Sequence, residues 1–213
     1  GPCGPTTEIY VQNAAGHDTE IWNIVFNQFF YPGSREELLA GVAGKSLQPL
    51  PVFGVDTGMG LERLAMVVQG KSTIFETDVF APLMEMMPPF VDVRRRRIIT
   101  DHARGVVFLL ADGVHFSNKG AGYVLRRLLR RIIAYELLLS INASVSDDIL
   151  NRVVDLYGGY YPEVAAAATV ITEEVKNERE RFSITVRRGL KEIEKIHALS
   201  ATQAFTLYES YGL

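Results

Sequence analysis

The sequence predicts an α+β protein in which strands and short helices precede an almost wholly helical region. Two observations carry this prediction. Aromatic and β-branched residues fill positions 20–30, which is typical of a central strand. Apolar residues recur every three or four positions between Val164 and Ile193, which is typical of a helix packed on one face. Pro88 and Pro89 lie between the two regions and mark the best candidate boundary, because proline stops a helix.

The first region is expected to be built from strands joined by turns. Residues 1–5 are too rich in glycine and proline for regular structure. We expect strand 20–30 to be central and buried, and residues 31–45 to form a surface insertion. The other expected elements are strands over 6–11 and 49–55 and helices over 36–40, 61–69 and 78–87.

The second region is expected to be helical to its end. Helices are predicted over 94–112, 122–140 and 147–157, and Pro162 suits the first position of a long helix or kinked pair that reaches His197. Ser200–Gln203 has the pattern of a capping box that opens a last short helix. The predicted domains are therefore 1–89, 90–199 and a following segment, 200–213.

Composition excludes several classes of protein. The chain has 213 residues, of which 47% are hydrophobic and 22% charged, as in an ordinary globular protein. No apolar run approaches the roughly 20 residues of a membrane helix, and no signal peptide is recognised. The single cysteine excludes an internal disulfide and fits a reducing compartment, so we expect a cytoplasmic protein, with an organelle as the open alternative. The cysteine and the four histidines are too few and too scattered for a structural zinc site.

Basic residues are concentrated in one part of an otherwise acidic chain. The formal net charge is −3, yet residues 94–131 contain ten basic residues against two acidic ones. Such a block is expected where a protein binds a polyanion, whereas solvated helix faces would explain any single pair of arginines.

Residues 55–63, Val-Asp-Thr-Gly-Met-Gly-Leu-Glu-Arg, are the most informative stretch. Asp56 can hold an amine, the two glycines let the backbone approach a ligand, and Arg63 can hold or stack on a nucleotide. The pattern suits an amino acid and ATP bound side by side. The plain alternative is a strand, a glycine turn and a helix without a ligand.

Five segments, in order, resemble class II aminoacyl-tRNA synthetases, in the form typical of the alanyl-tRNA synthetase family. Residues 55–63 resemble motif 3 of that family. The other matching segments are 1–9 (Gly-Pro-Cys-Gly-Pro-Thr-Thr-Glu-Ile), 20–26 (Glu-Ile-Trp-Asn-Ile-Val-Phe), 97–127 and 204–212. The resemblance implies part of a class II antiparallel sheet with helices, followed by an all-α domain that recognises tRNA.

The resemblance also implies how alanine is bound. Asp56 would hold the α-amino group, Trp22 and Asn23 would line the pocket, and a tight turn at Gly58 would leave room for a methyl group. Trp22 has an alternative role as an ordinary core aromatic.

For ATP, the resemblance implies Arg63, the backbone at Gly60 and Glu8, the last with Mg²⁺. No residue is expected to be a catalytic nucleophile or base, because activation relies on positioning and charge. In the family, motifs 1 and 2 precede the Gly-Pro-Cys-Gly-Pro segment, so we expect this chain by itself not to activate alanine. Its oligomeric state stays open.

The predicted tRNA contacts lie in and before the helix 122–140. Arg126, Arg127, Arg130 and Arg131 fall on one arc of roughly 140°, so we expect four outward guanidinium groups for phosphates, with Val124 and its apolar neighbours on the opposite side. Asn118 lies at the position where the family has the asparagine that reads a G·U pair in the acceptor stem. Lys119 follows it. The alternative for the arginines is a solubilising surface, and the alternative for Asn118 is an ordinary turn asparagine. For the whole chain, the alternative is a non-catalytic acceptor-stem RNA-binding protein.

Overall fold

The computed structural model describes residues 1–193 and 200–202. The chain divides into two compact units, Gly1–Pro82 (unit 1) and Leu83–Leu213 (unit 2). The predicted matching segment 204–212 lies outside the described residues, as does Gln203, the end of the predicted capping box. Within the described part, no helix is long and apolar enough to cross a membrane.

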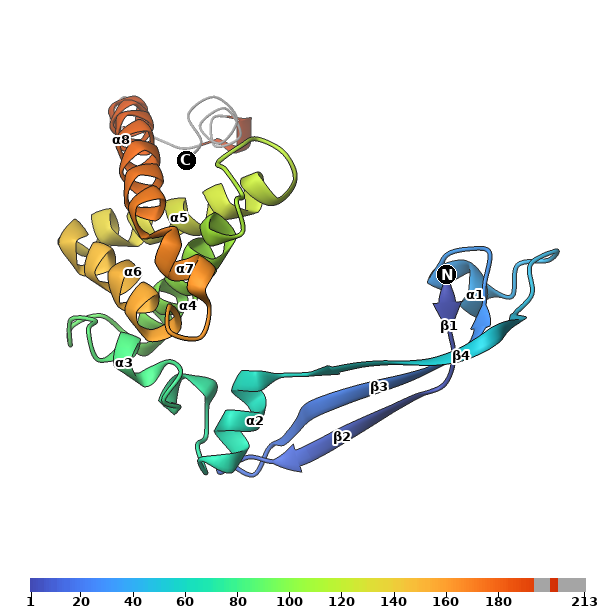
Figure 1. The fold of residues 1–213 in the computed structure, drawn as a ribbon. Coiled ribbons are helices and arrows are strands. Elements are labelled where there is room, and N and C mark those ends of the chain that lie inside the picture. Colours follow the sequence, from blue (N-terminus) through green and yellow to red (C-terminus); the bar gives the residue numbers. More distant parts are fainter. Residues whose placement is uncertain (194–199, 203–213) are drawn as a thin grey trace. The chain divides into compact units, whose positions relative to one another are not determined.

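Unit 1 is built on a four-stranded antiparallel sheet (Figure 1). Its strands are β1 (Pro2–Cys3), β2 (Thr6–Gln12), β3 (Asp18–Phe30) and β4 (Gln48–Met59). The long strand β3 is central: β1 and β2 follow one another along one of its edges, and β4 pairs with the other edge. The antiparallel sheet and the α+β class agree with the predicted fold.

Two predictions about the sheet were wrong. Residues 1–5 do contain regular structure, because Pro2 and Cys3 pair with Phe30 and Phe29 of β3. The strand β3 is central but not buried, since every residue in it is exposed or only half-buried. β4 is equally open, with Val52 79% exposed and Phe53 68% exposed. Aromatic and β-branched residues identify a strand, but whether a second layer covers it depends on packing.

Four short helices complete unit 1 and its junction. They are α1 (Arg35–Ala40), α2 (Leu61–Val68), the 3₁₀ helix η1 (Ile74–Glu76) and α3 (Ala81–Met84). Ser34 and Glu37 form a capping box that starts α1 within the predicted insertion. α3 is shorter than the predicted helix 78–87 because the residues before Pro88 form four-residue turns instead, with Met87 N bonded to Met84 O. The division between the units falls within α3, upstream of Pro88 and Pro89.

Unit 2 is a helical bundle around α4 (Figure 1). Its helices are α4 (Val93–Ala111), α5 (Gly120–Leu139), α6 (Ala143–Tyr157), α7 (Pro162–Ala166) and α8 (Ala168–Ile193). The fully buried side chains Val106, Leu129 and Ile149 show that α4, α5 and α6 share one core. The break at Ala167 makes α7 and α8 the predicted kinked pair as far as Ile193, and residues 194–197 of that prediction lie outside the described residues. α6 begins earlier than predicted because Asn142 caps it.

Candidate functional site

In unit 1, strand pairing brings together residues that are far apart in the sequence. Glu8 of β2 lies opposite Asn23 of β3, which in turn lies opposite Gly58 of β4. Asn23 Nδ2 donates a hydrogen bond to Glu8 Oε1 at 3.1 Å, so the two side chains share a face. Three of the predicted substrate-binding residues therefore form one row across the sheet.

The next row on this face contains Asp56. Residues two apart in a strand point to the same side, so Asp56 shares the face of Gly58, and Val25 lies opposite it on β3. Sequence reasoning missed Val25. Its position two residues after Asn23 in a strand was the signal that could have found it.

Trp22 lies on the other face of the sheet. It is adjacent to Asn23 in β3, and its Nε1 donates a hydrogen bond to Thr57 Oγ1, whose residue is adjacent to Gly58. Alternation along both strands thus separates Trp22 from Asn23 and Asp56. The structure does not group Trp22 with the other residues predicted to bind alanine.

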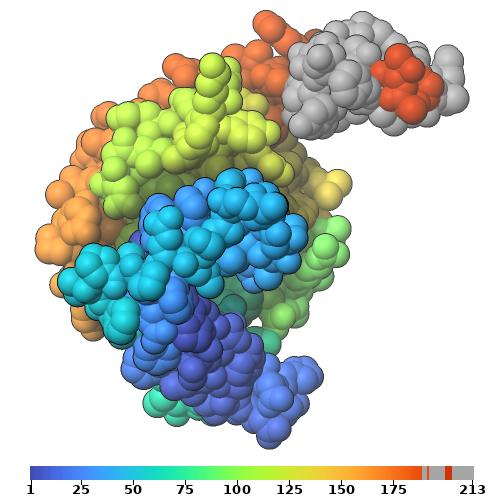
Figure 2. All heavy atoms as spheres, turned by 90° about the vertical axis from the view of Figure 1, so that its right-hand side faces the viewer, coloured from blue at the N-terminus to red at the C-terminus, as the bar shows by residue number. Residues whose placement is uncertain are grey.

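A groove opens beside the Glu8 row, at the end of the unit that carries α1. It has a volume of about 590 Å³, and its lining includes Thr6, Glu8, Asn23, Val25 and, from α1, Arg35. Figure 2 shows this end of unit 1, coloured blue to cyan, facing the viewer. Arg35 brings a guanidinium group to the groove and was not among the predicted residues. The groove is thus lined by side chains of four kinds: acidic, amide, apolar and basic.

Gly58 was predicted to lie in a tight turn, but it lies within β4. A Cβ added there would meet no atom within 4 Å, so neither a tight turn nor neighbouring atoms of the described chain restrict the space beside it. The change of direction comes later, at Gly60, which precedes α2 and donates to Ile21 O at 3.1 Å.

Arg63 lies in the first turn of α2 and is held against the start of β3. Its Nη1 donates a hydrogen bond to the carbonyl oxygen of Glu20 at 2.8 Å, and the Glu20 carboxylate lies 3.8 Å away. Its stem packs against Gly60, where a Cβ would come within 3.3 Å of the Arg63 side chain. The side chain remains 52% exposed, so it can still contact a ligand.

In unit 2, the four arginines of α5 divide into two pairs. Arg126 and Arg130 both contact Glu178 of α8, with nitrogen–oxygen distances of 3.1 and 2.8 Å, and Glu178 is 1% exposed. Arg130 also lies over the ring of Phe182, 4.8 Å from its centre. The prediction of four outward guanidinium groups was therefore wrong for these two. A helical projection shows which residues share an arc, but not that α8 covers part of that arc.

Arg127 and Arg131 do face outward, together with two tyrosines. Tyr123, Arg127, Arg131 and Tyr135 are spaced by four residues along α5, and we call them the outer ridge. The guanidinium carbons of Arg127 and Arg131 lie 5.8 Å from the ring centres of Tyr123 and Tyr135, respectively. Among the described residues, neither arginine has a carboxylate at ion-pair distance. Val124 is 51% exposed, so the predicted apolar side of the helix is narrower than expected.

Asn118 lies in the exposed loop before α5, followed by Lys119. The loop is held by Ser117, whose Oγ donates to the carbonyl oxygen of Lys119 at 2.8 Å. Asn118 Oδ1 accepts a hydrogen bond from Arg126 Nη1. The structure thus joins the loop to the buried pair of Arg126 and Glu178, which the sequence did not indicate.

Comparison with known proteins gives matches that cover the whole chain. The family model of class II tRNA synthetases (A) matches residues 1–213. The chain belongs to the class II tRNA synthetase family. It is similar to the alanine–tRNA ligases of Dehalococcoides mccartyi (36% identical over 242 aligned positions), Thermoanaerobacter pseudethanolicus (36% over 245) and Rhizobium johnstonii (37% over 238). Each alignment covers the whole chain but only 27%, 27% and 26% of the relative, so this class II chain spans about a quarter of their length.

The Glu8 carboxylate of this class II synthetase chain accepts hydrogen bonds at both of its oxygens. Its Oε2 accepts a hydrogen bond from the Tyr10 hydroxyl at 2.6 Å, which raises the pKa of Tyr10, and its Oε1 accepts from Asn23. No group of three or more acidic, histidine or cysteine side chains that could hold a metal occurs among the described residues. A single carboxylate fits Mg²⁺ shared with phosphate oxygens, the usual arrangement for that ion.

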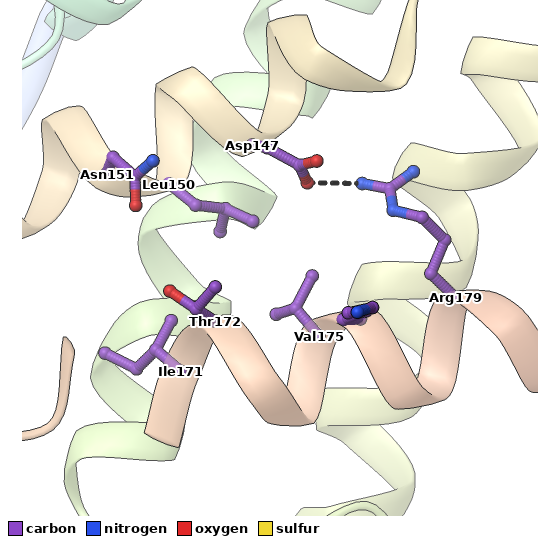
Figure 3. A pocket seen from close by; sticks show the side chains of 8 residues that line it. Asp147, Leu150, Asn151, Ile171, Thr172, Val175 and Arg179 are labelled. Carbon is purple, nitrogen blue, oxygen red and sulfur yellow. Dashed lines mark hydrogen bonds and ion pairs between the residues drawn. The ribbon is translucent and has the colours of Figure 1, made fainter. Parts of the chain in front are cut away.

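A second cavity of this class II chain lies between α6 and α8 of unit 2 (Figure 3). Its volume is about 170 Å³, and Leu150, Ile171 and Val175 give it an apolar wall. At one end Arg179 donates to Asp147 at 2.9 Å. None of the predicted site residues lines it, so we assign it no role in substrate binding.

Proposed function

We propose that the chain is part of an alanine–tRNA ligase, which uses ATP to activate alanine and transfers it to tRNA. The family match along the whole chain and the alanine–tRNA ligase relatives support this proposal. The observation in the structure that carries it is the pair of rows on one sheet face, Glu8 with Asn23 and Gly58, and Val25 with Asp56.

Each group on this face has a part in binding alanine and ATP. Asp56 would hold the α-amino group, and the methyl group would lie against Val25 beside Gly58, where a side chain would obstruct it. Arg63 would contact ATP from the start of α2, with the backbone of Gly60 close to it. Glu8 would share Mg²⁺ with the phosphates, and the ion would supply positive charge there. Such a site works by positioning and charge.

In unit 2, the outer ridge and the Asn118 loop would bind the acceptor stem of the alanine tRNA. Arg127, Arg131 and Lys119 would contact phosphates, and a tyrosine ring lies beside each of the two arginines. Asn118 would accept a hydrogen bond from the guanine 2-amino group, which a G·U wobble leaves unpaired in the shallow minor groove. A carbonyl oxygen has two lone pairs, so Asn118 Oδ1 can accept from Arg126 and from guanine together.

The proposal is tested by titrating the chain with acceptor-stem hairpins that carry G·U or G·C. Asn118→Ala is expected to weaken G·U binding about tenfold and to leave G·C binding unchanged. Arg127→Met and Arg131→Met are expected to weaken both hairpins equally and to reduce the slope of log affinity against log salt by about one for each contact. Arg152→Met, at an exposed position of α6, is the control. Equal wild-type affinities for both hairpins would exclude base-pair reading.

A second candidate is a protein that binds acceptor-stem RNA without catalysis. It is favoured by one observation: the outer ridge and Asn118 all lie in unit 2, so RNA binding there needs no residue of unit 1. ATP–pyrophosphate exchange distinguishes the two. We expect the 213-residue chain alone to give no alanine-dependent exchange, because the family's motif 2 supplies the arginine that holds the α-phosphate. Exchange by the chain would contradict this expectation, and its absence from the full-length protein would favour the second candidate.

A further inference from the structure

We propose that Arg126 and Glu178 are positioning residues that hold the Asn118 carboxamide in the one orientation in which it meets RNA. The proposal rests on the function proposed above, in which Asn118 reads a base pair. It assigns to two charged residues a role in discrimination between base pairs, whereas the outer ridge supplies affinity.

A continuous set of contacts joins α8 to the loop. Arg126 Nη1 donates to Asn118 Oδ1, and Arg126 Nε lies 3.1 Å from Glu178 Oε1. The guanidinium group therefore has the asparagine on one side and the carboxylate on the other. Since Arg126 is 17% exposed and Glu178 only 1%, the charge pair is largely shielded from water.

Glu178 is itself held by a second arginine. Arg130 Nε donates to Glu178 Oε1 at 2.9 Å and its Nη2 lies 2.8 Å from the same oxygen. Arg130 is also packed over Phe182 of the same helix α8. The carboxylate thus cannot turn away from α5 without losing both arginines, which keeps its position defined.

The contact with Arg126 determines that the carboxamide oxygen of Asn118, and not its nitrogen, faces the guanidinium group. A rotation of 180° about the last side-chain bond of asparagine exchanges the oxygen acceptor and the nitrogen donor, and a free exposed asparagine can present either. A guanidinium group only donates hydrogen bonds, so the atom that it contacts must be the oxygen. Among the described residues nothing accepts a hydrogen bond from Asn118 Nδ2, so that end remains open to solvent.

A fixed orientation matters because the bases differ in donors and acceptors. In the minor groove the unpaired guanine 2-amino group is a donor. It is recognised by a carboxamide whose oxygen stays in place and does not exchange with the amide nitrogen. If the amide flips freely, it can pair with acceptors on a G·C edge as well as with the donor of G·U. We therefore expect loss of Arg126 to reduce discrimination, and loss of Arg127 to reduce affinity for both stems.

The test compares Arg126→Lys with the matched variant Arg127→Lys in the full chain. Lysine keeps the charge but lacks the planar fork that contacts two partners at once. With G·U and G·C hairpins at one salt concentration, Arg126→Lys is expected to lower the affinity ratio about tenfold, mainly through weaker G·U binding. Arg127→Lys is expected to leave the ratio within twofold of the wild type. A wild-type ratio retained by Arg126→Lys would overturn the proposal.

A measurement without RNA separates this proposal from the function on which it rests. In nuclear magnetic resonance spectra, the side-chain amide of Asn118 is identified by its absence in Asn118→Ala. Its order parameter is expected to be high in the wild type and in Arg127→Lys, because the side chain is held there. It is expected to be low in Arg126→Lys and Glu178→Gln, where the side chain becomes mobile. If the wild type does not discriminate between the hairpins, the proposed base reading is contradicted. A lower order parameter in Arg126→Lys would still support the positioning of Asn118 by Arg126. An unchanged order parameter in a folded Arg126→Lys overturns it.

Discussion

At the scale of single residues, two glycines decide where the predicted sites can form. Gly4 lies so close to β3 that an added Cβ would overlap the carbonyl oxygen of Phe26, and Pro5 O accepts a hydrogen bond from Phe26 N at 2.9 Å. Gly122 lies in the first turn of α5, where a Cβ would overlap His115 O and Ser117 Oγ. In both cases a backbone must pass where a side chain would be.

We predict that Gly122→Ala displaces the loop that carries Asn118. The added methyl group must push back the backbone of His115 and the side chain of Ser117, at a cost of about 1–3 kcal/mol in the free energy of unfolding. The amide signals of residues 115–118 should shift, as measured by nuclear magnetic resonance. Ala121→Gly, at the neighbouring exposed position, adds no atom and is the control. A Gly122→Ala variant with wild-type stability and shifts would contradict the prediction.

At the scale of elements, two buried charge clusters hold α8 against its neighbours. Neighbouring residues of α8 supply opposite charges: Glu178 contacts arginines of α5, and Arg179 contacts Glu136 of α5 and Asp147 of α6. Glu136 also accepts from Ser146 of α6. Removing one partner from a buried pair costs about 3–5 kcal/mol, because a charge is left without compensation. The clusters therefore specify which face of α8 meets α5.

Glu136 makes the stability of unit 2 depend on pH. Burial raises the pKa of Glu136, although the nearby Arg179 opposes this effect. The folded state then binds a proton more tightly than the unfolded state, whose carboxyl has a pKa of about 4.3. The stability associated with this proton is complete below the unfolded pKa and is lost as pH rises through the folded pKa.

We predict that Glu136→Gln removes this part of the pH dependence. In urea unfolding between about pH 4 and pH 7, the free energy of unfolding of the wild type minus that of the variant should fall as pH rises. Asp147 stays in place to contact Arg179 in the variant. Parallel curves for the two proteins would show that Glu136 titrates alike in the folded and unfolded states.

At the scale of the whole molecule, the chain consists of two units with different kinds of stabilisation. Unit 2 has a dense apolar core, in which Val106, Leu129 and Ile149 are fully buried. In unit 1 the strands lie largely open, and the single tryptophan, Trp22, is located there. Fluorescence of Trp22 therefore reports on unit 1, whereas helical circular dichroism reports mainly on unit 2.

We predict that Ile149→Ala destabilises unit 2 and leaves unit 1 unchanged. Truncation of this buried side chain should cost about 2–5 kcal/mol and lower the thermal midpoint seen by circular dichroism. The midpoint seen by Trp22 fluorescence should stay within error of the wild type. Ile184→Ala, at a residue that is 52% exposed, is the control and should change neither. Equal shifts in both signals would show that the units unfold together.

The sequence by itself determined the family, the α+β class, most helices and strands, and the candidates Asp56, Arg63 and Asn118. Local patterns carry this information, because periodicity, capping residues and glycine-rich motifs act over a few residues. Tertiary structure alone decided the contacts between distant segments. It separated Trp22 from Asn23, placed Val25 opposite Asp56, and withdrew Arg126 and Arg130 from the outward face by pairing them with Glu178. The physical reason is that a helix or strand pattern shows which side chains share a face, but not which distant segment covers that face.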